Sequence, residues 1–218
     1  MPRQSLSLDR ATPTAIAVAA LAILDERGPE ALNLRSLAER LGVSHTTIHR
    51  RCGGTVAGLL DLCTDHLAAG LPLLDADTEW AAGTEARFAH LYRLLVDHPG
   101  LVALRGARPW LGQELLERLV EPQLAANLAV GMTPEDAISA YRQMYLLTLG
   151  AASFVNHNDP QAAQRATRAA LAALDPNRFP TLTGHLNTIL PAVVDHEVYR
   201  RGLRAMIAAA DPRTGGAA

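Results

Sequence analysis

The sequence predicts an all-α fold, and three observations support this. The composition is 49% hydrophobic but only 4% aromatic, which favours closely packed helices. No run of alternating β-branched residues, the pattern typical of strands, occurs in the 218 residues. A Thr-Pro pair, typical of a helix start, occurs at Thr12-Pro13 and again at Thr133-Pro134. A chain of this length can bury a core as one large domain or two small ones.

The first helix is expected over residues 13–27, ending before Gly28 and Pro29. Apolar residues recur along it at helical spacing. The apolar run 15–24 could also be the apolar part of a signal peptide. The Thr-Pro start and the Gly-Pro stop favour a helix of the folded protein instead. No apolar run approaches the ~20 residues that cross a bilayer.

Two short helices are expected next, over residues 34–41 and 45–51. Gly42 follows the last periodic apolar residue, where a helix commonly ends in the left-handed conformation. Ser44 suits the N-cap of the second helix, and Ile48 is the large apolar residue that would face the core. The remaining residues of that helix can bond base edges and phosphates in a major groove: His45, Thr46, Thr47, His49, Arg50 and Arg51. This pattern predicts a DNA-binding helix-turn-helix.

A larger helical domain is expected after residue 55. Its helices are predicted over residues 56–69, 80–97, 113–130, 134–157, 161–174 and 184–210. Pro122 should kink the third of these, and Pro191 should disturb the last. The expected organisation is a three-helix helix-turn-helix domain over 1–55, a C-terminal helical domain over 56–210, and a flexible tail over 211–218.

The pattern around the turn resembles the TetR family of transcriptional regulators. Residues 37–44 and 47–51 resemble its L-A-x-x-L-G-V-S-x-x-T-L-Y-x-H pattern. Four further segments resemble signatures of the subgroup that includes the tetracycline repressor: 179–182 (F-P-x-L), 199–203 (F-x-x-G-L), 106–109 (G-T-R-P) and 131–137 (G-x-S-x-E-x-A). The resemblance implies a ligand-responsive repressor.

The resemblance implies that the helix over residues 45–51 lies in the major groove of operator DNA. Arg35, at the start of the preceding helix, matches a family position that also reads a base, and a guanidinium reads guanine well. The residues expected to bind DNA, with Ser44 acting first as the cap, are Arg35, Ser44, His45, Thr46, Thr47, His49, Arg50 and Arg51.

Two positions depart from the family pattern. The phosphate-binding Tyr of the family is His49 here, and its phosphate-binding Lys is replaced by Thr55 or Val56. The second match stays open because the turn at Gly53 and Gly54 has one extra residue. Both changes remove sequence-independent affinity, so we expect binding that is weaker or more salt-sensitive than usual.

The resemblance also implies a homodimer, since one short reading helix covers too few base pairs. Two-fold symmetry would place the second reading helix about one turn (~34 Å) away. The predicted helices 134–157 and 184–210 should form a four-helix bundle with their symmetry mates. Residues that could lie in that interface or in the protein's own core are Leu146, Leu149, Val193, Leu203 and Ile207.

Family members bind an inducer inside the C-terminal domain. The tetracycline repressor holds magnesium with a His shortly before its G-T-R-P turn, and here that position is Leu104, with Ala107 in place of the Thr. An aliphatic side chain cannot ligate magnesium, so we expect a mostly apolar small molecule rather than magnesium–tetracycline. Candidate lining residues, each of which taken singly fits the core better than a ligand contact, are Phe88, Tyr92, Trp110, Tyr141, Met144 and Tyr145, with His66 or His90 as a polar anchor.

Charge is a weak guide to function here. The formal net charge is −2, although residues 1–60 carry 7 Arg and 5 acidic residues and the remainder carries 13 Arg and 17. All 20 basic residues are Arg, so a basic phosphate contact must come from Arg or a protonated His. Cys52 and Cys63 suit a reducing cytoplasm, and we expect a cytoplasmic protein with no membrane partner.

Other functions fit the sequence less well. His45, His49 and Cys52 have the i, i+4, i+7 spacing of metal ligands, but a fourth ligand is not evident and a metal there would block the DNA face. Adjacent Asp-His pairs do not face each other on a helix, and no nucleophile or phosphate-binding motif occurs, so we expect no enzyme and no cofactor. The alternative is a helical interaction or ligand-binding protein with weakened DNA binding.

Overall fold

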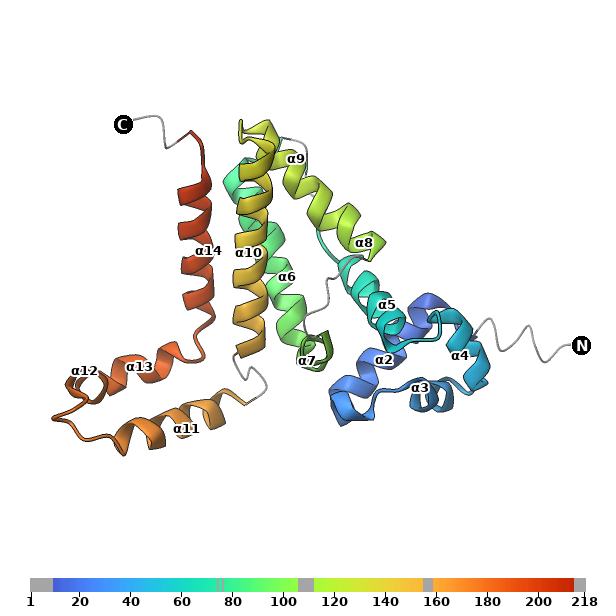
Figure 1. Ribbon diagram of the computed structural model, residues 1–218, viewed down its shortest axis with the longest axis horizontal. Coiled ribbons are helices and arrows are strands. Elements are labelled where there is room, and N and C mark those ends of the chain that lie inside the picture. The colour runs from blue at the N-terminus through green and yellow to red at the C-terminus, as the bar shows by residue number, and fades with distance from the viewer. Residues whose placement is uncertain (1–9, 74, 76, 106–111, 155–158, 214–218) are drawn as a thin grey trace, which may run out of the picture.

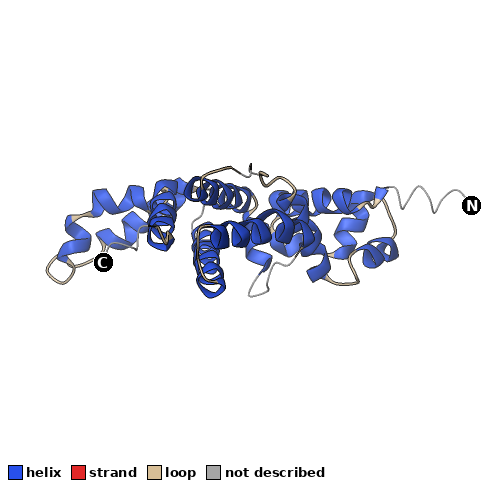
Figure 2. Ribbon diagram, turned by 90° about the horizontal axis from the view of Figure 1, so that it is seen from above, coloured by secondary structure: helices blue, strands red, loops and turns tan. Residues whose placement is uncertain are grey.

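The computed structural model describes residues 10–73, 75, 77–105, 112–154 and 159–213. All regular structure in these ranges is helical, which confirms the predicted fold class (Figures 1 and 2). The elements are α2 (Pro13–Arg27), the 3-10 turn η1 (Pro29–Ala31), α3 (Leu34–Leu41), α4 (His45–Arg51), α5 (Val56–Ala68), α6 (Trp80–Asp97), α7 (Pro99–Arg105), α8 (Gln113–Leu115), the π-helical turn η2 (Leu116–Val120), α9 (Glu121–Ala129), α10 (Pro134–Phe154), α11 (Pro160–Ala172), α12 (Pro180–Gly184), α13 (Leu186–Ala192) and α14 (His196–Ala210). No helix within the described ranges is long and apolar enough to cross a membrane.

A first hydrophobic core is built by α2, α3, α4 and α5. The hydroxyl of Thr12 accepts a hydrogen bond from the backbone N–H of Ala15 at 3.1 Å, so α2 starts where the Thr-Pro pair predicts. The apolar stripe of α2 is buried against this core, and α2 packs along α5 and α3. Arg40 on α3 donates two 2.7 Å hydrogen bonds to the carboxylate of Glu26 on α2. The apolar run 15–24 is therefore part of the folded domain.

A second core lies between α6, α10 and α14, which run side by side in Figure 1. Phe88 on α6 and Leu203 on α14 are fully buried there. The hydroxyl of Tyr199 donates to the carbonyl oxygen of Phe88 at 3.0 Å and lies 2.9 Å from the hydroxyl of Thr148. One buried tyrosine thus joins all three helices.

The two cores meet along α5 and α7. Leu59 and Cys63 of α5 belong to the first core, whereas Ala68, at the end of the same helix, belongs to the second. The neighbours Leu101 and Val102 divide in the same way on α7. Any displacement in the second core can therefore reach the first through helices that are part of both.

The helix predicted over residues 113–130 is interrupted near Pro122, as expected, but by a π turn. The backbone N–H of Glu121 donates to the carbonyl of Leu116, five residues back. Proline has no N–H and crowds the preceding turn, and a wider turn relieves that crowding. The helix α7 was not predicted. Pro99 lies two positions after Asp97, the last residue of α6, and begins a new helix, a position that suits proline.

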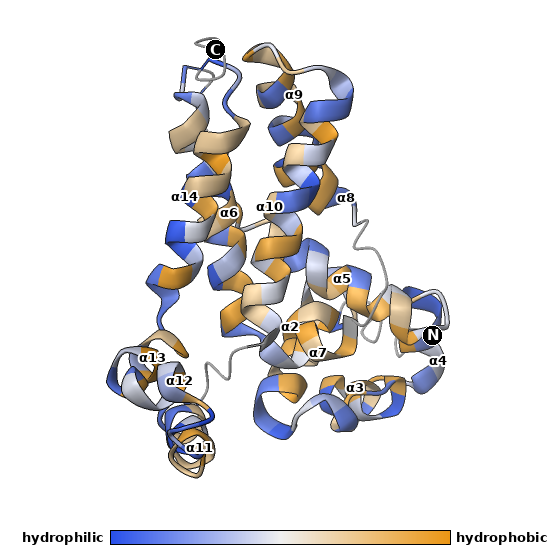
Figure 3. Cartoon of the chain, turned by 60° about the vertical axis from the view of Figure 1, so that its left-hand side comes forward, coloured by the Kyte–Doolittle hydropathy of each residue, from blue (hydrophilic) through white to orange (hydrophobic). Residues whose placement is uncertain are grey.

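The prediction of a single helix over residues 184–210 is wrong. The chain forms α13 and α14 there, with α12 ending at Gly184. The carboxylate of Asp195 accepts from the backbone N–H of Glu197 at 2.9 Å and so caps α14 as a new helix. Pro191 lies in the last turn of α13. Helices α11, α12 and α13 contact one another and form an arm that projects beside the body (Figure 3).

Candidate DNA-reading and effector sites

The turn between α3 and α4 has the predicted geometry. Gly42 adopts φ 64° and ψ 35°, the left-handed conformation that ends α3. The hydroxyl of Ser44 accepts from the backbone N–H of Thr47 at 3.1 Å and caps α4. Ile48 is fully buried in the first core. The cap and this single anchor together fix how α4 is presented.

The opposite face of α4 is open, and α4 lies at the right-hand end of the molecule in Figure 1. Its exposed residues are His45, Thr46, His49, Arg50 and Arg51. Thr47 differs from these, because it is partly buried and its hydroxyl lies 2.8 Å from the hydroxyl of Ser44. The Thr47 hydroxyl therefore belongs to the cap as well as to the edge of the open face.

Arg35 also lies on the surface of the helix-turn-helix. Its Nε donates to Oε1 of Glu39 at 3.2 Å, and the two side chains are 84% and 69% exposed. An exposed pair of this kind contributes about 0–1 kcal/mol. Arg35 can therefore exchange Glu39 for another acceptor at little cost.

The two-glycine turn after α4 holds the ring of His49. Gly54 has φ 75°, and a Cβ atom built on it would lie 2.7 Å from Cε1 of His49. The backbone N–H of Gly54 also donates to the carbonyl of His49 at 2.7 Å. A side chain at position 54 would displace the imidazole from its place on the open face.

The three residues of the alternative metal site on α4 do not converge. The rings of His45 and His49 are 6.1 Å apart and exposed, whereas Cys52 is 2% exposed and packs into the first core. Over the ranges that the structure describes, no three His, Cys, Asp or Glu side chains gather as metal ligands.

Helix α5 connects the reading helix to the C-terminal body. At its start, Gly58 packs against the carbonyl oxygen of Cys52, where a Cβ atom would not fit. Near its end, the carboxylate of Asp65 accepts from the backbone N–H of Glu114 at 3.1 Å and so caps α8. Gly112 leaves the room for this carboxylate, and burial raises the pKa of Asp65. Helix α5 is thus in close contact with the end of α4 at its start and with the start of α8 near its own end.

Several candidate lining residues for an effector meet in the second core. Phe88, Met144 and Tyr145 are buried, and Tyr141 is partly buried. The ring of Tyr141 lies 5.7 Å from that of Tyr145, stacked, and 6.1 Å from that of Phe88, tilted. These residues form one aromatic group between α6 and α10. Trp110 lies outside the described residues, as do the other residues of the segment 106–111.

Tyr92 has different neighbours. Its ring stacks on Tyr199 at 4.0 Å, and its hydroxyl lies 3.0 Å from Nδ1 of His196 on α14. It lines a groove of about 540 Å³ between α6 and the start of α14. His66, on α5, and His90, on α6, are both partly buried; burial and the nearby Arg93 lower the pKa of His90.

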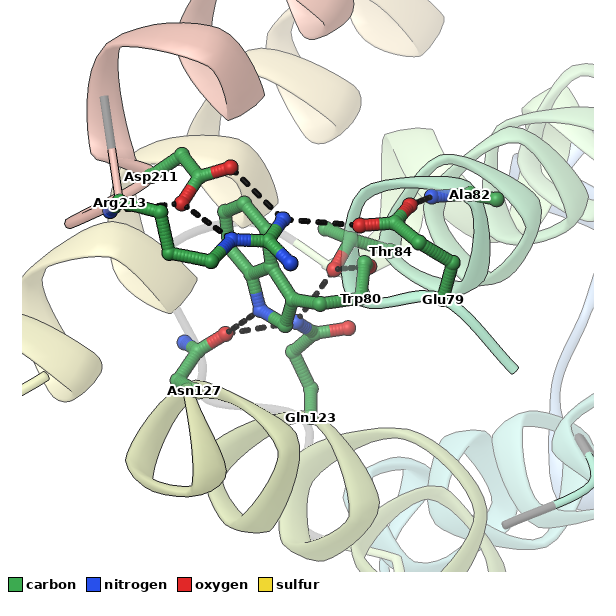
Figure 4. A network of polar contacts seen from close by, with 8 residues as sticks. All are labelled: Glu79, Trp80, Ala82, Thr84, Gln123, Asn127, Asp211 and Arg213. Carbon is green, nitrogen blue, oxygen red and sulfur yellow. Dashed lines mark hydrogen bonds and ion pairs between the residues drawn. The ribbon is translucent and has the colours of Figure 1, made fainter. Parts of the chain in front are cut away.

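A buried polar network between α6 and α9 was not predicted (Figure 4). Oδ1 of Asn127 accepts from Nε1 of Trp80 at 2.9 Å and from Nε2 of Gln123 at 2.8 Å, and Nδ2 of Asn127 donates to the carbonyl of Ala137 at 3.0 Å. Nε2 of Gln123 also donates to the hydroxyl of Thr84 at 2.9 Å. The two amides and the hydroxyl are fully buried. The sequence signal was two amides four residues apart in an otherwise apolar stretch, on one face of a helix.

The network ends on a charged side chain. Nη1 of Arg87 donates to Oε1 of Gln123 at 3.2 Å. Arg87 is partly buried, and this burial lowers the pKa of its guanidinium. Position 87 lies one turn after Thr84 on α6, so the guanidinium is at the boundary between the apolar core and α9.

An exposed polar helix that follows a helix-turn-helix turn and is joined by α5 to a larger helical body is an organisation that DNA-binding regulators use. Comparison with known proteins gives the family. Residues 71–209 match the family model described as "Tetracyclin repressor-like, C-terminal domain". The chain is 30% identical over 187 residues to an HTH-type transcriptional regulator of Saccharopolyspora erythraea, covering 84% of this chain and 78% of that one. The chain belongs to the TetR family of DNA-binding transcriptional regulators.

One further relative agrees with this assignment, and one solved structure shares the fold. The HTH-type transcriptional repressor DrrR1 of Streptomyces coeruleorubidus is 29% identical over 153 residues, which cover 69% of this chain and 54% of that protein. The crystal structure of the TetR family protein ActR from Streptomyces coelicolor, in complex with actinorhodin, superposes with a TM-score of 0.78 at 24% identity. That superposition covers 95% of this chain and 99% of the ActR chain, and it shows a shared fold.

Proposed function

We propose that this chain is a ligand-responsive transcriptional repressor. It binds an inverted-repeat operator as a homodimer in the cytoplasm and leaves the DNA when a small molecule occupies the C-terminal body. The observation that carries the proposal is the presentation of α4, with Ile48 fully buried and the hydrogen-bonding side chains around it exposed. A helix held in this way can enter the major groove without rearrangement of its domain. Residues 1–55 would read DNA, and residues 56–210 would bind effector and partner.

The proposed DNA contacts divide into two groups. Bases are read by exposed donors and acceptors near the start of α3 and along α4, those of Arg35, His45, Thr46 and Arg50, with the partly buried Thr47 at the edge of the same face. Phosphates are met by Arg51 at the rim of that face and, more weakly than by the family's Tyr, by His49. Ser44 keeps its role as the cap. The phosphate set is small, which supports the expectation of weaker binding. Fewer released counterions should also make the salt dependence of that binding shallow, so the expectation of greater salt sensitivity is not kept.

Arg35→Ala is expected to weaken binding to the preferred operator by about 1–3 kcal/mol and binding to random DNA by much less. The reason is that a base contact is lost only on the correct sequence. Fluorescence anisotropy on both DNAs measures the two losses. The matched control is Arg27→Ala, which removes one exposed arginine from the same domain and should change both affinities little. Equal losses on both DNAs for Arg35→Ala would reduce Arg35 to a phosphate contact.

The proposed dimer surface is the outer face of α10 and α14. Leu149, Leu203 and Ile207, which were candidates for it, are 5%, 0% and 4% exposed within one chain and belong to its own core. Val193 is partly buried, and Leu146 is 52% exposed. Two further apolar side chains are exposed on these helices, Ile138 at 57% and Val198 at 45%. Ile138 and Leu146 are eight residues apart and share one stripe of α10.

Leu146→Asp is expected to shift the protein from dimer to monomer. A carboxylate near the two-fold axis would face its own copy without a counter-charge. Light scattering at micromolar concentration would then report the 23.3 kDa monomer instead of twice that mass. Leu128→Asp, at a 46% exposed position on α9, should leave the dimer intact. A monomeric unmodified protein would refute the dimer altogether.

The proposed effector is a mostly apolar organic molecule bound near the aromatic group of α6 and α10. A protein of this fold, ActR, was solved with actinorhodin, which supports an organic ligand. Occupancy would act on α5, which caps α8 through Asp65 and packs on the end of α4 through Gly58. Moving α5 would change the separation of the two reading helices in the dimer.

Tetracycline with magnesium is expected not to release the protein from its operator. The position of the metal-binding His is Leu104, which packs against the first core. Titrating the operator complex with micromolar tetracycline and millimolar magnesium, followed by gel shift, checks this. Release of DNA under those conditions would show that the alignment on the segment 106–109 is wrong.

A further inference from the structure

Arg87 differs from the other arginines of the described part of the chain. Arg87 and Arg118 are partly buried there, whereas the remaining described arginines are exposed. Arg118 donates to the carboxylate of Glu114 at 2.8 Å. Arg87 donates to the neutral amide oxygen of Gln123 at 3.2 Å, and within the described residues no carboxylate lies at ion-pair distance from it. Its positive charge is thus partly buried without an opposite charge.

This arrangement is costly unless something else supplies the anion. Taking a guanidinium out of water disfavours its charged form, and the pKa of Arg87 is lowered by burial for that reason. An apolar or neutral side chain at position 87 would avoid the free-energy cost of taking a charge out of water. The cost is recovered when a ligand brings a negative charge, because charge-assisted hydrogen bonds to guanidinium are about twice as strong as neutral ones.

The surrounding network holds the guanidinium in place. Nε2 of Gln123 is occupied by Thr84 and Asn127, so Oε1 of Gln123 is the atom left for Arg87. All three of these network side chains are fully buried, which fixes the amide plane. Gln123 occupies one of the five N–H donors of Arg87, and the fork retains donors for a further acceptor.

We propose that Arg87 binds an anionic group, such as a carboxylate or sulfonate, on an otherwise apolar effector. The inference rests on the proposed function, because it names the ligand class of the same C-terminal body. The rest of the ligand would contact apolar side chains on the face of α6 that carries Arg87, such as Leu91 one turn further on. Gln123 positions Arg87 and need not touch the ligand.

A matched pair of fluorescent probes tests this inference on the full chain. 8-Anilinonaphthalene-1-sulfonate is an anion, and N-phenyl-1-naphthylamine has the same ring system without the charge. Arg87→Gln is expected to weaken sulfonate binding by about tenfold or more and to change binding of the neutral probe by less than about twofold. Arg87→Lys should recover part of the sulfonate affinity, because it restores the charge but not the fork. Arg27→Gln, an exposed arginine on α2 and outside the C-terminal body, should change neither.

The outcomes separate this inference from the proposed function. Equal loss of both probes in Arg87→Gln with a lowered melting temperature would mean that Arg87 only supports the fold, and the inference would fail. It would also fail if Arg93→Gln, in the groove between α6 and the start of α14, and not Arg87→Gln, removed the sulfonate. Operator binding without any probe is measured in parallel and should equal that of the unmodified protein. The unmodified protein could also bind no operator while Arg87→Gln weakens binding of the sulfonate and not of the neutral probe. That result would refute the proposed repressor function and support the anion site at Arg87.

Discussion

Replacing Ile48 by Ala is expected to destabilise the helix-turn-helix by about 2–5 kcal/mol, the range for truncating a fully buried aliphatic side chain. Ile48 is 0% exposed and is the side chain by which α4 enters the first core. With it removed, α4 keeps its Ser44 cap but loses its anchor. Specific operator binding should fall with the population of the ordered helix. Amide hydrogen exchange along α4 measures the effect directly, because it reports local opening.

The matched control for Ile48→Ala is Val18→Ala on α2. Val18 lies in the same domain and is 50% exposed, so its truncation should change stability by no more than about 0.5 kcal/mol. Comparable exchange rates along α4 in the two variants would contradict the claim that Ile48 anchors the reading helix.

Asn127→Ala is expected to destabilise the C-terminal body by roughly 2–4 kcal/mol, because a buried polar group that loses its partner costs about 1–3 kcal/mol and a small void is added. The indole N–H of Trp80 loses its acceptor, and the carbonyl of Ala137 loses a donor. Gln123 keeps its bond to Thr84. Denaturant unfolding followed by tryptophan fluorescence measures the loss, since Trp80 is 5% exposed and reports this site.

Asn187→Ala provides the matched control on α13, where the asparagine is exposed. It should leave the unfolding midpoint unchanged within about 0.5 kcal/mol. If both variants unfolded alike, the buried network would contribute nothing measurable and Arg87 would lack the support that its proposed role requires.

The boundaries of the first helices were predictable because their signals are local. Thr12 and Ser44 cap helices through bonds to residues three positions away, and Gly42 ends α3 by its own conformation. The fold class followed from the same kind of evidence. The anchor Ile48 was also evident, as the only large apolar residue of a polar helix.

The rest depended on tertiary contacts that a single sequence does not show. Gln123 and Thr84 are 39 positions apart, and a buried amide looks like a surface amide until its partner is known. Leu203 was ambiguous for the same reason, because an apolar side chain fits a dimer interface as well as the core of one chain. Its 0% exposure within one chain assigns it to the core. Tyr92 was grouped with the other aromatics by type, whereas its stacking on Tyr199 sets it against α14.

The measurement that most directly tests the central claim is a footprint of the full-length protein on the DNA that flanks its own gene. The proposed repressor should protect two half-sites related by inversion, with centres about one helical turn (~34 Å) or a small multiple apart, at concentrations where random DNA stays unprotected. Protection should disappear in Ile48→Ala and persist in Val18→Ala. Protection of a single half-site, or none above that of random DNA, would contradict the account of a dimeric, sequence-specific regulator.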